Sequence, residues 1–494
     1  MSMTSTTKTA APGPEPLLPP HWSTLDSVLW AYLLLPMLIF LPGFFVPAVG
    51  LPLAMLALAG GLHFLAGAGR NPQIAIPPLG DLLLLAVFAA AWAMLGGAGH
   101  LFHANGTDWV PRFAVLRDLV VEAWPPRYED GGTTMLLRAP LSYYLPVAWL
   151  TNVTSLALAD SLLLVWTWLG VALFFGANLG GSRQRKLAAA LIFAFASGLD
   201  AVGLLLRHGS LPWPMQHIEW WAEGMQYSSN TTLLFWVPNH GLPGWIAAAW
   251  LWRFRDDTRF LARLPMLFLP LMLWSPLVAL GLLPLAAIAA AKHWHHLLGA
   301  GNRRMLLTSL ALVALPGALV ASYLLLGMFG PAVEPNALST TATVLRQPAG
   351  LGNTLLFILL EVALFCAVLL RHDRSPLTLG VVALLLVLPW TRFGPNNDLL
   401  MRASIPALAI LWLLLADTLT ATAADGGLSG AGRKLLLLLF VLGAITPLLE
   451  IQRALGGRSW PADTRLTAPQ ALGGFPPHYF AKRDGHWLHG FLRR

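Results

Sequence analysis

The segment 106–124 carries carboxylates and an arginine at spacings that suit acid–base chemistry beside a phosphate. It reads GTDWVPRFAVLRDLVVEAW and contains Asp108, Arg112, Asp118 and Glu122. A carboxylate can remove the proton of an attacking hydroxyl, so Asp108 is the predicted general base. The alternative is that Asp108 only caps a helix. Arg112, four residues later, suits bidentate binding of a phosphate, and its alternative is an ion pair with Asp108.

Asp118 and Glu122 are interpreted mainly as solvated charges on the same helix, with Asp118 kept as a candidate assistant in catalysis. At about 100° per residue, the segment separates into an apolar and a polar face. The apolar face comprises Val110, Phe113, Leu116, Val120 and Trp124. We therefore expect a helix that lies on the membrane surface, apolar side down, with Arg117 snorkelling.

A second group of candidate residues lies in the loop 207–240, RHGSLPWPMQHIEWWAEGMQYSSNTTLLFWVPNH. Aromatic faces and scattered hydrogen-bonding groups suit a sugar ring, so His217, Glu219 and Trp220 are predicted to bind substrate. The aromatic belt of a membrane interface is the alternative explanation for the tryptophans. His240 lies at the mouth of the next span and is predicted to assist catalysis.

A third group lies in 391–402, TRFGPNNDLLMR. Asn397 is a natural N-cap, and Asp398 suits the N-terminus of a helix. Arg402 is expected one turn inside a span, where a charge normally faces a partner. That partner is either Asp398, four residues earlier, or the phosphate of a lipid-linked substrate. The prediction favours the phosphate and counts all three residues as substrate-binding.

Glu361 lies near the middle of the apolar run LLFILLEVALF. An acidic residue at this depth in a span indicates a functional site by default, and it favours a proton-coupled transporter. The alternative is a neutral, hydrogen-bonded packing residue.

The elements that position these residues are membrane spans. The chain has 494 residues, 56% hydrophobic and 11% charged, whereas soluble domains have about 25% charged residues. Apolar runs of roughly 17–23 residues predict helices rather than barrel strands. We therefore expect an all-α polytopic membrane protein with about 11–13 transmembrane helices and interfacial helices in the first large external loop. The net charge of +8 is attributed to cytoplasmic anchoring residues, not to nucleic-acid binding.

The candidate spans cover most of the chain between residues 27 and 450. The pair 264–274 and 275–291 contains four prolines and is interpreted as a broken or tightly paired hairpin. Tyr143–Asn152 is interpreted as a half-span or an interfacial helix. The predicted spans are 27–44, 47–67, 81–99, 158–178, 187–206, 239–252, 264–274, 275–291, 305–327, 352–370, 376–391, 399–417 and 434–450.

Basic clusters set the expected orientation, because lysine and arginine concentrate in cytoplasmic loops. With these clusters inside, loops 100–157, 207–238, 328–351 and 392–398 fall on the external side. Residues 1–25 are then a disordered cytoplasmic N-terminus, 26–450 the transmembrane domain, and 451–494 an extracytoplasmic tail. The expected location is the inner, or plasma, membrane. The basic clusters are Arg183/Arg185/Lys186, Arg253/Arg255/Arg259/Arg263, Lys292/Arg303/Arg304, Arg371/Arg374 and Arg433/Lys434.

The layout resembles the GT-C superfamily of integral-membrane glycosyltransferases. The likeness lies in GTDWVPRFAVLRDLVVEAWP followed by APLSYYLPVAW, in WSPLVALGLLP, and in FGPNNDLLMRASIPAL. It implies transfer of a sugar from a polyprenyl-phosphate donor to a glycan or lipid acceptor on the external face. The family's catalytic acid would fall on Asp108, and a lipid-phosphate arginine on Arg402. Residues 106–108 lack the paired acidic motif of several members, so no metal ligand or cofactor is predicted and a divalent cation stays open.

Two alternatives remain beside the glycosyltransferase: a polysaccharide polymerase or ligase acting on lipid-linked glycans, and a membrane transporter or flippase. A transporter is expected to show internal repeats and broken helices near the midplane, and no convincing repeat relates the two halves of the sequence. The chain carries no P-loop, GxGxxG or HExxH motif in a usable context. An activated substrate is therefore expected to arrive as a lipid rather than as a nucleotide.

Overall fold

The computed structural model describes residues 16–66, 77–102, 106–152, 154–211, 216–327, 350–394, 396–421, 428, 430–457, 465–483 and 487–493. Most of the external loop predicted at 328–351 lies outside these residues. The first half of the chain forms α1 (Thr24–Phe44), α2 (Pro47–Ala66), α3 (Leu79–Met94), α4 (Gly106–Val121), β1 (Arg127–Asp130), β2 (Thr133–Leu137), α5 (Leu145–Asn152), η1 (Leu156–Leu158), α6 (Ala159–Asn178), α7 (Arg183–Phe195), α8 (Asp200–His208), α9 (Asn230–Trp236) and α10 (Pro238–Arg253).

The second half is also mainly helical. It forms α11 (Thr258–Trp274), α12 (Pro276–Lys292), α13 (Trp294–Leu297), α14 (Ala300–Leu324), α16 (Leu351–Ile358), η2 (Leu359–Ala363), α17 (Leu364–Leu369), α18 (Pro376–Val387), η3 (Leu388–Trp390), α19 (Asp398–Ala403), α20 (Ile405–Thr420), α21 (Gly430–Gly443), α22 (Ile445–Gly456), α23 (Ala468–Ala471), β3 (Phe480–Lys482) and η5 (Trp487–Phe491).

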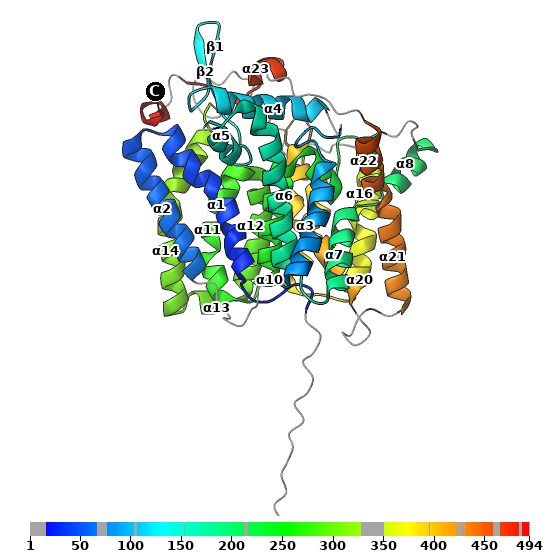
Figure 1. The fold of residues 1–494 in the computed structure, drawn as a ribbon. Coiled ribbons are helices and arrows are strands. Elements are labelled where there is room, and N and C mark those ends of the chain that lie inside the picture. The colour runs from blue at the N-terminus through cyan, green and yellow to red at the C-terminus, as the bar shows by residue number, and fades with distance from the viewer. Residues whose placement is uncertain are drawn as a thin grey trace, which may run out of the picture.

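The helices form an upright bundle, and their composition confirms an all-α polytopic membrane protein (Figure 1). Within the described ranges, seven helical stretches are long and apolar enough to cross a membrane. Four shorter apolar helices accompany them: α3, α12, α18 with η3, and α20. Large apolar side chains such as Met55 and Val87 remain exposed on the outside of the bundle, as expected for a surface in contact with lipid.

Helix α10 is the centre of the bundle. All of its residues are buried, and it packs against α6, α11, α12 and α20. At its end, Arg253 forms a buried ion pair with Asp26 of α1, with Nη1–Oδ1 and Nη2–Oδ2 distances of 2.6 and 3.0 Å. Trp250 also donates to Asp26 at 2.8 Å. A buried charge needs this degree of pairing, so the contact fixes α1 against α10.

One end of the bundle carries α4, the β-strands and α23, and we call it the α4 face (Figure 1). The hairpin β1–β2 is antiparallel, with Arg127 opposite Leu136, and β3 joins β2 with Leu137 opposite Phe480. The segment predicted as a tail from residue 451 therefore begins with the last turns of α22, and its described C-terminal part folds back as α23 and β3. Helix α13 lies at the opposite end of the bundle.

Three predicted spans are interrupted in the structure. The span 187–206 divides into α7 and α8 around residues 196–199, and the span 434–450 divides into α21 and α22 at Ala444. The span 352–370 contains a π-helical turn, η2, between α16 and α17. Leu199 N donates to Leu360 O at 3.2 Å, so the first interruption contacts the π-helical turn. A Cβ on Gly443 would overlap Ser197 O, so the break between α21 and α22 lies against the break between α7 and α8.

Several local expectations change. Residues 16–25 are ordered rather than disordered, because Leu17 and Trp22 are buried and Ser23 caps α1 in a capping box with Asp26. The rest of the predicted disordered N-terminus lies outside the described residues. Helix α5 has eight residues, which span about 12 Å and cannot cross a bilayer. The proline-containing pair is confirmed as two helices, α11 and α12, that meet at Ser275.

Candidate functional site

Arg112 is the central residue of the candidate site on the α4 face. It lies on α4, is buried, and donates through Nη1 to Asn239 Oδ1 at 2.8 Å and to Tyr144 Oη at 3.4 Å. Its Nε is buried without a hydrogen-bond partner among the described residues. Nε and Nη2 point along the same edge of the guanidinium, which is the edge that binds phosphate bidentately. On that edge, Nη2 lies 3.9 Å from Asp108 Oδ2.

Electrostatics keep Arg112 charged. Burial opposes its charge, but the neighbouring Tyr144, Asp108 and Tyr479 raise the pKa of the guanidinium above its usual value. Burial also raises the pKa of Tyr144 to about 12, despite the opposing effect of Arg112. A protonated tyrosine and a permanent cation therefore face the same small region at neutral pH.

Asn239 connects Arg112 to His240. Because an arginine can only donate, the Arg112 contact fixes the Asn239 amide with Oδ1 toward Arg112 and Nδ2 toward His240. Nδ2 then donates to His240 Nε2 at 3.2 Å, and His240 Nδ1 donates to Ser275 Oγ at 2.7 Å. His240 is therefore buried and neutral, with its Nε2 as the acceptor. The first residues of α10 and the junction between α11 and α12 hold it in place.

Asp108 is the exposed member of the group. Its side chain is 40% exposed, while the side chain of Arg112 beside it is 8% exposed. The helix α4 begins at Gly106, so Asp108 lies inside the first turn rather than at the cap. A carboxylate in a first turn is favoured by the helix dipole. The i,i+4 contact with Arg112 that the sequence offered as an alternative is present, but it is long.

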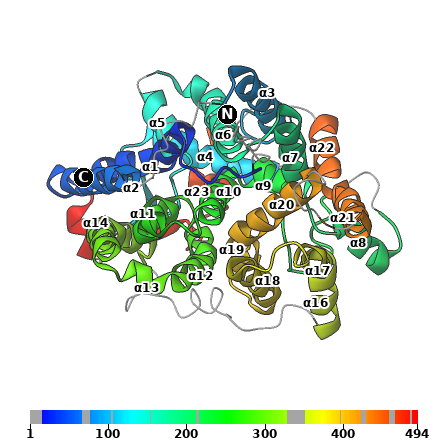
Figure 2. The ribbon, with the colours of Figure 1, turned by 90° about the horizontal axis from the view of Figure 1, so that it is seen from below.

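Arg402 approaches the same region from α19. It lies close enough to His240 to interact with it electrostatically, as Arg112 does. Arg402 pairs with Asp398, one of its two predicted partners, with an Nη2–Oδ1 distance of 2.9 Å and 34% of its side chain exposed. Arg402 lies on the short helix α19, which ends at Ala403 before α20 begins at Ile405, rather than in the first turn of one continuous helix. Figure 2 shows α19 between α12 and α20, and both helices contact it.

Asn397 does not cap α19 with its side chain. It adopts a left-handed conformation with φ of 57° and makes no capping hydrogen bond. Its Nδ2 donates to Gly224 O at 3.2 Å, and its Oδ1 accepts from Phe393 N at 3.2 Å. Asn397 therefore joins the 391–398 loop to the 216–229 loop, and this long-range contact left no trace in the local sequence.

Residues of the C-terminal segment also lie at the site, and they were not predicted from the sequence. Tyr479 interacts electrostatically with Arg112, and the exposed His478 interacts with both Asp398 and Arg402. Arg138 fixes this segment, because it donates to the carbonyl groups of Pro477 and Leu324. We call Asp108, Arg112, Asn239, His240 and Arg402 the arginine site.

Asp118 is not a solvated charge, contrary to the expectation from the helical pattern. It is buried and accepts from Tyr128 Oη at 2.6 Å, from Ala468 N at 2.7 Å and from Arg117 at 2.8 Å. Ten residues separate it from Asp108, or about 15 Å along a helix. Asp118 therefore joins α4 to β1 and α23, and both of its oxygens accept hydrogen bonds from the protein.

The predicted sugar-binding loop contains a different buried polar group. Glu219 accepts from Ser229 N at 2.9 Å, Thr232 Oγ1 at 2.5 Å and Gln226 Nε2 at 2.7 Å. Burial raises the pKa of Glu219 to about 7, against the lowering effect of His217. Trp220 is 62% exposed and donates to Gln226. Glu219 organises its own loop, while Trp220 presents an aromatic face outward.

His217 extends this group toward α22. Its Nδ1 lies 2.9 Å from Glu450 Oε1, and its Nε2 lies 3.8 Å from Glu219 Oε2. Burial alone would lower the pKa of His217, but the hydrogen bond to Glu450 and the charge of Glu219 raise it. Asp200 and Glu361 are buried and interact electrostatically with Glu219. We call Asp200, His217, Glu219, Glu361 and Glu450 the carboxyl cluster.

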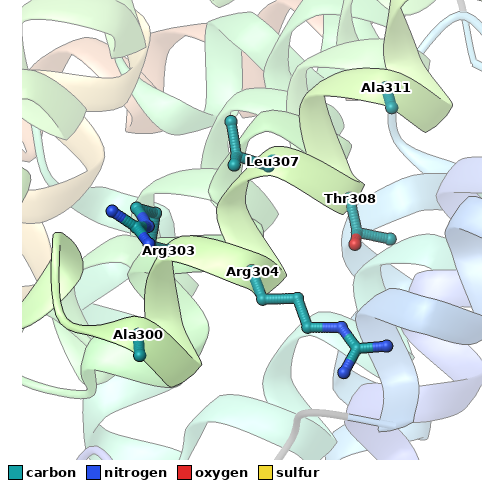
Figure 3. Close-up of a pocket in the computed structure, with 6 residues that line it drawn as sticks. All are labelled: Ala300, Arg303, Arg304, Leu307, Thr308 and Ala311. Carbon is teal, nitrogen blue, oxygen red and sulfur yellow. The ribbon is translucent and has the colours of Figure 1, made fainter.

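A shallow depression at the start of α14 is a third polar feature (Figure 3). It is lined by Ala300, Arg303, Arg304, Leu307, Thr308 and Ala311. The two arginines are exposed on one helix near α13, at the end of the bundle opposite the α4 face. Exposed arginines at a helix end are typical of anchoring to lipid headgroups, and this feature contributes nothing to the arginine site.

Comparisons with known proteins identify no relative. No protein-family model, no curated protein and no solved structure matches the chain. The GT-C resemblance therefore rests on the layout and residues of the chain itself.

Proposed function

We propose that the protein is a membrane glycosyltransferase that moves a sugar from a polyprenyl-phosphate donor to a glycan or lipid acceptor. The single observation that supports this most is the Nε–Nη2 edge of the Arg112 guanidinium, where Nε has no hydrogen-bond partner among the described residues and Nη2 lies 3.9 Å from Asp108. A buried arginine with an unpartnered Nε, beside a partly exposed carboxylate, is suited to a ligand that carries phosphate oxygens. Arg402 supplies a second cation from a distant part of the sequence.

Each residue then has a role in one displacement reaction. An acceptor hydroxyl attacks the anomeric carbon, and the bond between that carbon and the phosphate oxygen breaks. Asp108 takes the hydroxyl proton, and the phosphate leaves with the bonding electron pair. Arg112 and Arg402 stabilise the charge that develops on the phosphate. The neutral His240 and Asn239 position Arg112, and direct attack inverts the configuration of the sugar.

The α4 face is the extracytoplasmic face in this proposal. The basic clusters predicted for the cytoplasm include Arg303 and Arg304 at the start of α14, next to α13, and α13 lies at the opposite end of the bundle. Lysine and arginine concentrate in cytoplasmic loops, and this charge distribution supports an extracytoplasmic arginine site. The proposed location is the inner, or plasma, membrane. A lipid carrier would then place its phosphate at the bilayer surface, at the level of α4.

Binding of the carrier lipid tests the proposal. Purified wild-type protein in detergent is expected to bind a short-chain polyprenyl phosphate and to bind the corresponding polyprenol much more weakly. Arg112→Lys is expected to reduce the difference, and Arg117→Lys, on the same helix but paired with Asp118 and Glu122, is the matched control. Equal binding of phosphate and alcohol by the wild-type protein would contradict the proposal.

A transporter is the second candidate, and a specific observation favours it. The three interrupted helices meet around the buried Asp200 and Glu361, and discontinuous helices with ionisable groups at their breaks are common in secondary transporters. This candidate predicts that neutralising Glu361 abolishes function. The glycosyltransferase predicts that the same substitution has little effect on transfer.

A further inference from the structure

The interruptions of three helices bring two carboxyl groups together inside the membrane-spanning bundle. Asp200 begins α8 after the break from α7, and Glu361 lies in the π-helical turn η2. Both side chains are buried. π-helical turns are rare and frequently occur at functional sites. In Figure 2, α8, α16, α17, α21 and α22 lie together on the side of the bundle away from α2 and α14.

The two carboxyl groups are each satisfied on one oxygen only. Asp200 Oδ2 accepts from Ser197 Oγ at 3.0 Å and from Thr446 Oγ1 at 2.8 Å. Glu361 Oε1 accepts from Trp221 Nε1 at 2.9 Å. Among the described residues, no donor reaches Asp200 Oδ1 or Glu361 Oε2. Two buried acceptor atoms are therefore left over, one on each side chain.

These two side chains lie close together. A Cβ on Gly198, two residues before Asp200, would overlap Glu361 Oε2, and the two carboxyl groups interact electrostatically. Two carboxylate oxygens cannot hydrogen-bond unless one of them carries a proton. Two like charges in a buried site also disfavour each other strongly. A single proton between the two groups allows one carboxyl to donate to the other and removes one charge.

We propose that Asp200 and Glu361 form a membrane-embedded proton-binding site in which the two carboxyl groups hold one proton between them. The proposal does not depend on sugar transfer, so either can fail without the other. Breaks in α7–α8 and α21–α22 and the π-helical turn all border the pair, so loss of the proton would place two negative charges at the meeting point of three helices.

A chain of polar side chains connects this site to the surface. Glu219 interacts with both members of the pair and hydrogen-bonds to Gln226, which lies 3.5 Å from His217. His217 contacts Glu450, and Glu450 pairs with Arg453 at 2.8 Å, whose side chain is 22% exposed. The titratable groups that interact with the pair are thus Glu219, His217 and Tyr227 of the loop, and Glu450 of α22 lies behind His217.

Infrared spectroscopy of the purified protein tests the proposal. A protonated carboxyl has a carbonyl stretch that is separate from amide and carboxylate bands and shifts in D2O. The spectrum should be recorded at about pH 9, because Glu219, with a pKa of about 7, is then ionised. The wild-type protein is expected to show one such band per chain. Asp200→Asn and Glu361→Gln are each expected to move or remove it, and the double variant should lack it.

The controls keep each outcome decisive. Glu223→Gln changes an exposed carboxyl of the same loop and should leave the band unchanged. If a variant fails to fold, wild-type protein with 13C-labelled aspartate and glutamate carboxyls must show the band at a lower frequency. A missing band in the wild type, or a band that both single variants leave unchanged, overturns the proposal. If the band appears only when choline replaces Na+ in the buffer, the pair binds a metal cation in place of the proton. That result also overturns the proposal.

Discussion

The arginine site and the carboxyl cluster are both polar, but among the described residues different groups lack a hydrogen-bond partner in the two. In the arginine site it is a donor, and in the carboxyl cluster it is two acceptors. The donor without a partner is Arg112 Nε, near the partly exposed carboxylate of Asp108. In the carboxyl cluster, the leftover groups are acceptors: Asp200 Oδ1 and Glu361 Oε2. A spare donor with positive charge suits an anion, and paired spare acceptors suit a proton. The comparison indicates where substrate and proton would bind.

The largest expected effect is on Asp108. Asp108→Asn keeps the shape of the side chain and removes the base, so the rate of sugar transfer should fall by about 10²–10⁴-fold. Because the side chain is partly exposed, the melting temperature should stay close to the wild-type value. Transfer from a polyprenyl-phosphate sugar in proteoliposomes measures the rate. Asp130→Asn, an exposed carboxylate on the same face, should remain fully active; equal activity of both variants would remove Asp108 as the base.

Arg112 should give the next largest effect. Arg112→Lys keeps the positive charge but loses the planar fork, and hydrogen bonds to charged groups contribute about 1.5–3 kcal/mol. Transfer should therefore fall by about 10–100-fold. Measuring the rate against donor concentration separates binding from turnover. Arg117→Lys on the same helix should behave like the wild type, and an equally impaired Arg117→Lys would show that α4 matters only for folding.

Glu219, in the carboxyl cluster, should make the stability of the folded protein depend on pH, and this effect should be smaller. Burial raises its pKa from 4.5 to about 7, so the folded protein keeps a proton that the unfolded chain releases between these values. Its stabilising contribution is present below about pH 4.5 and is lost as the pH rises to about 7, at up to about 1.4 kcal/mol per pH unit. Thermal unfolding of Glu219→Gln should lack this slope, whereas Glu223→Gln should retain it.

The sequence predicted the class of fold well because apolar length and composition are local properties. The helices α1, α2, α6, α12 and α14 lie where their apolar runs predicted them. It also placed a helix at α4 from the pattern around Asp108. The interruptions were not predicted, because a π-helical turn and the break before Asp200 are stabilised by contacts between distant segments.

Some candidate residues were predicted correctly and others were not, again because contacts between distant segments cannot be read from the local sequence. Asp108 interacts electrostatically with Arg112, and both Arg112 and Arg402 interact with His240, so these four candidates lie in one region. Asp118 was misjudged because its partners, Tyr128 and Ala468, lie on a hairpin and a C-terminal helix that no helical wheel includes. Tyr479 was missed because nothing in its local sequence indicates that the C-terminal segment returns to α4.

The most direct test of sugar transfer compares Arg402→Lys with Glu361→Gln in one assay. The assay measures the initial rate at which polyprenyl phosphate is released in proteoliposomes that contain a polyprenyl-phosphate sugar. The glycosyltransferase predicts that Arg402→Lys loses about tenfold, the effect of one weakened charged hydrogen bond. It predicts that Glu361→Gln is nearly unchanged, because the amide donates where the shared proton lay. An impaired Glu361→Gln beside an unimpaired Arg402→Lys would contradict the glycosyltransferase and favour the transporter.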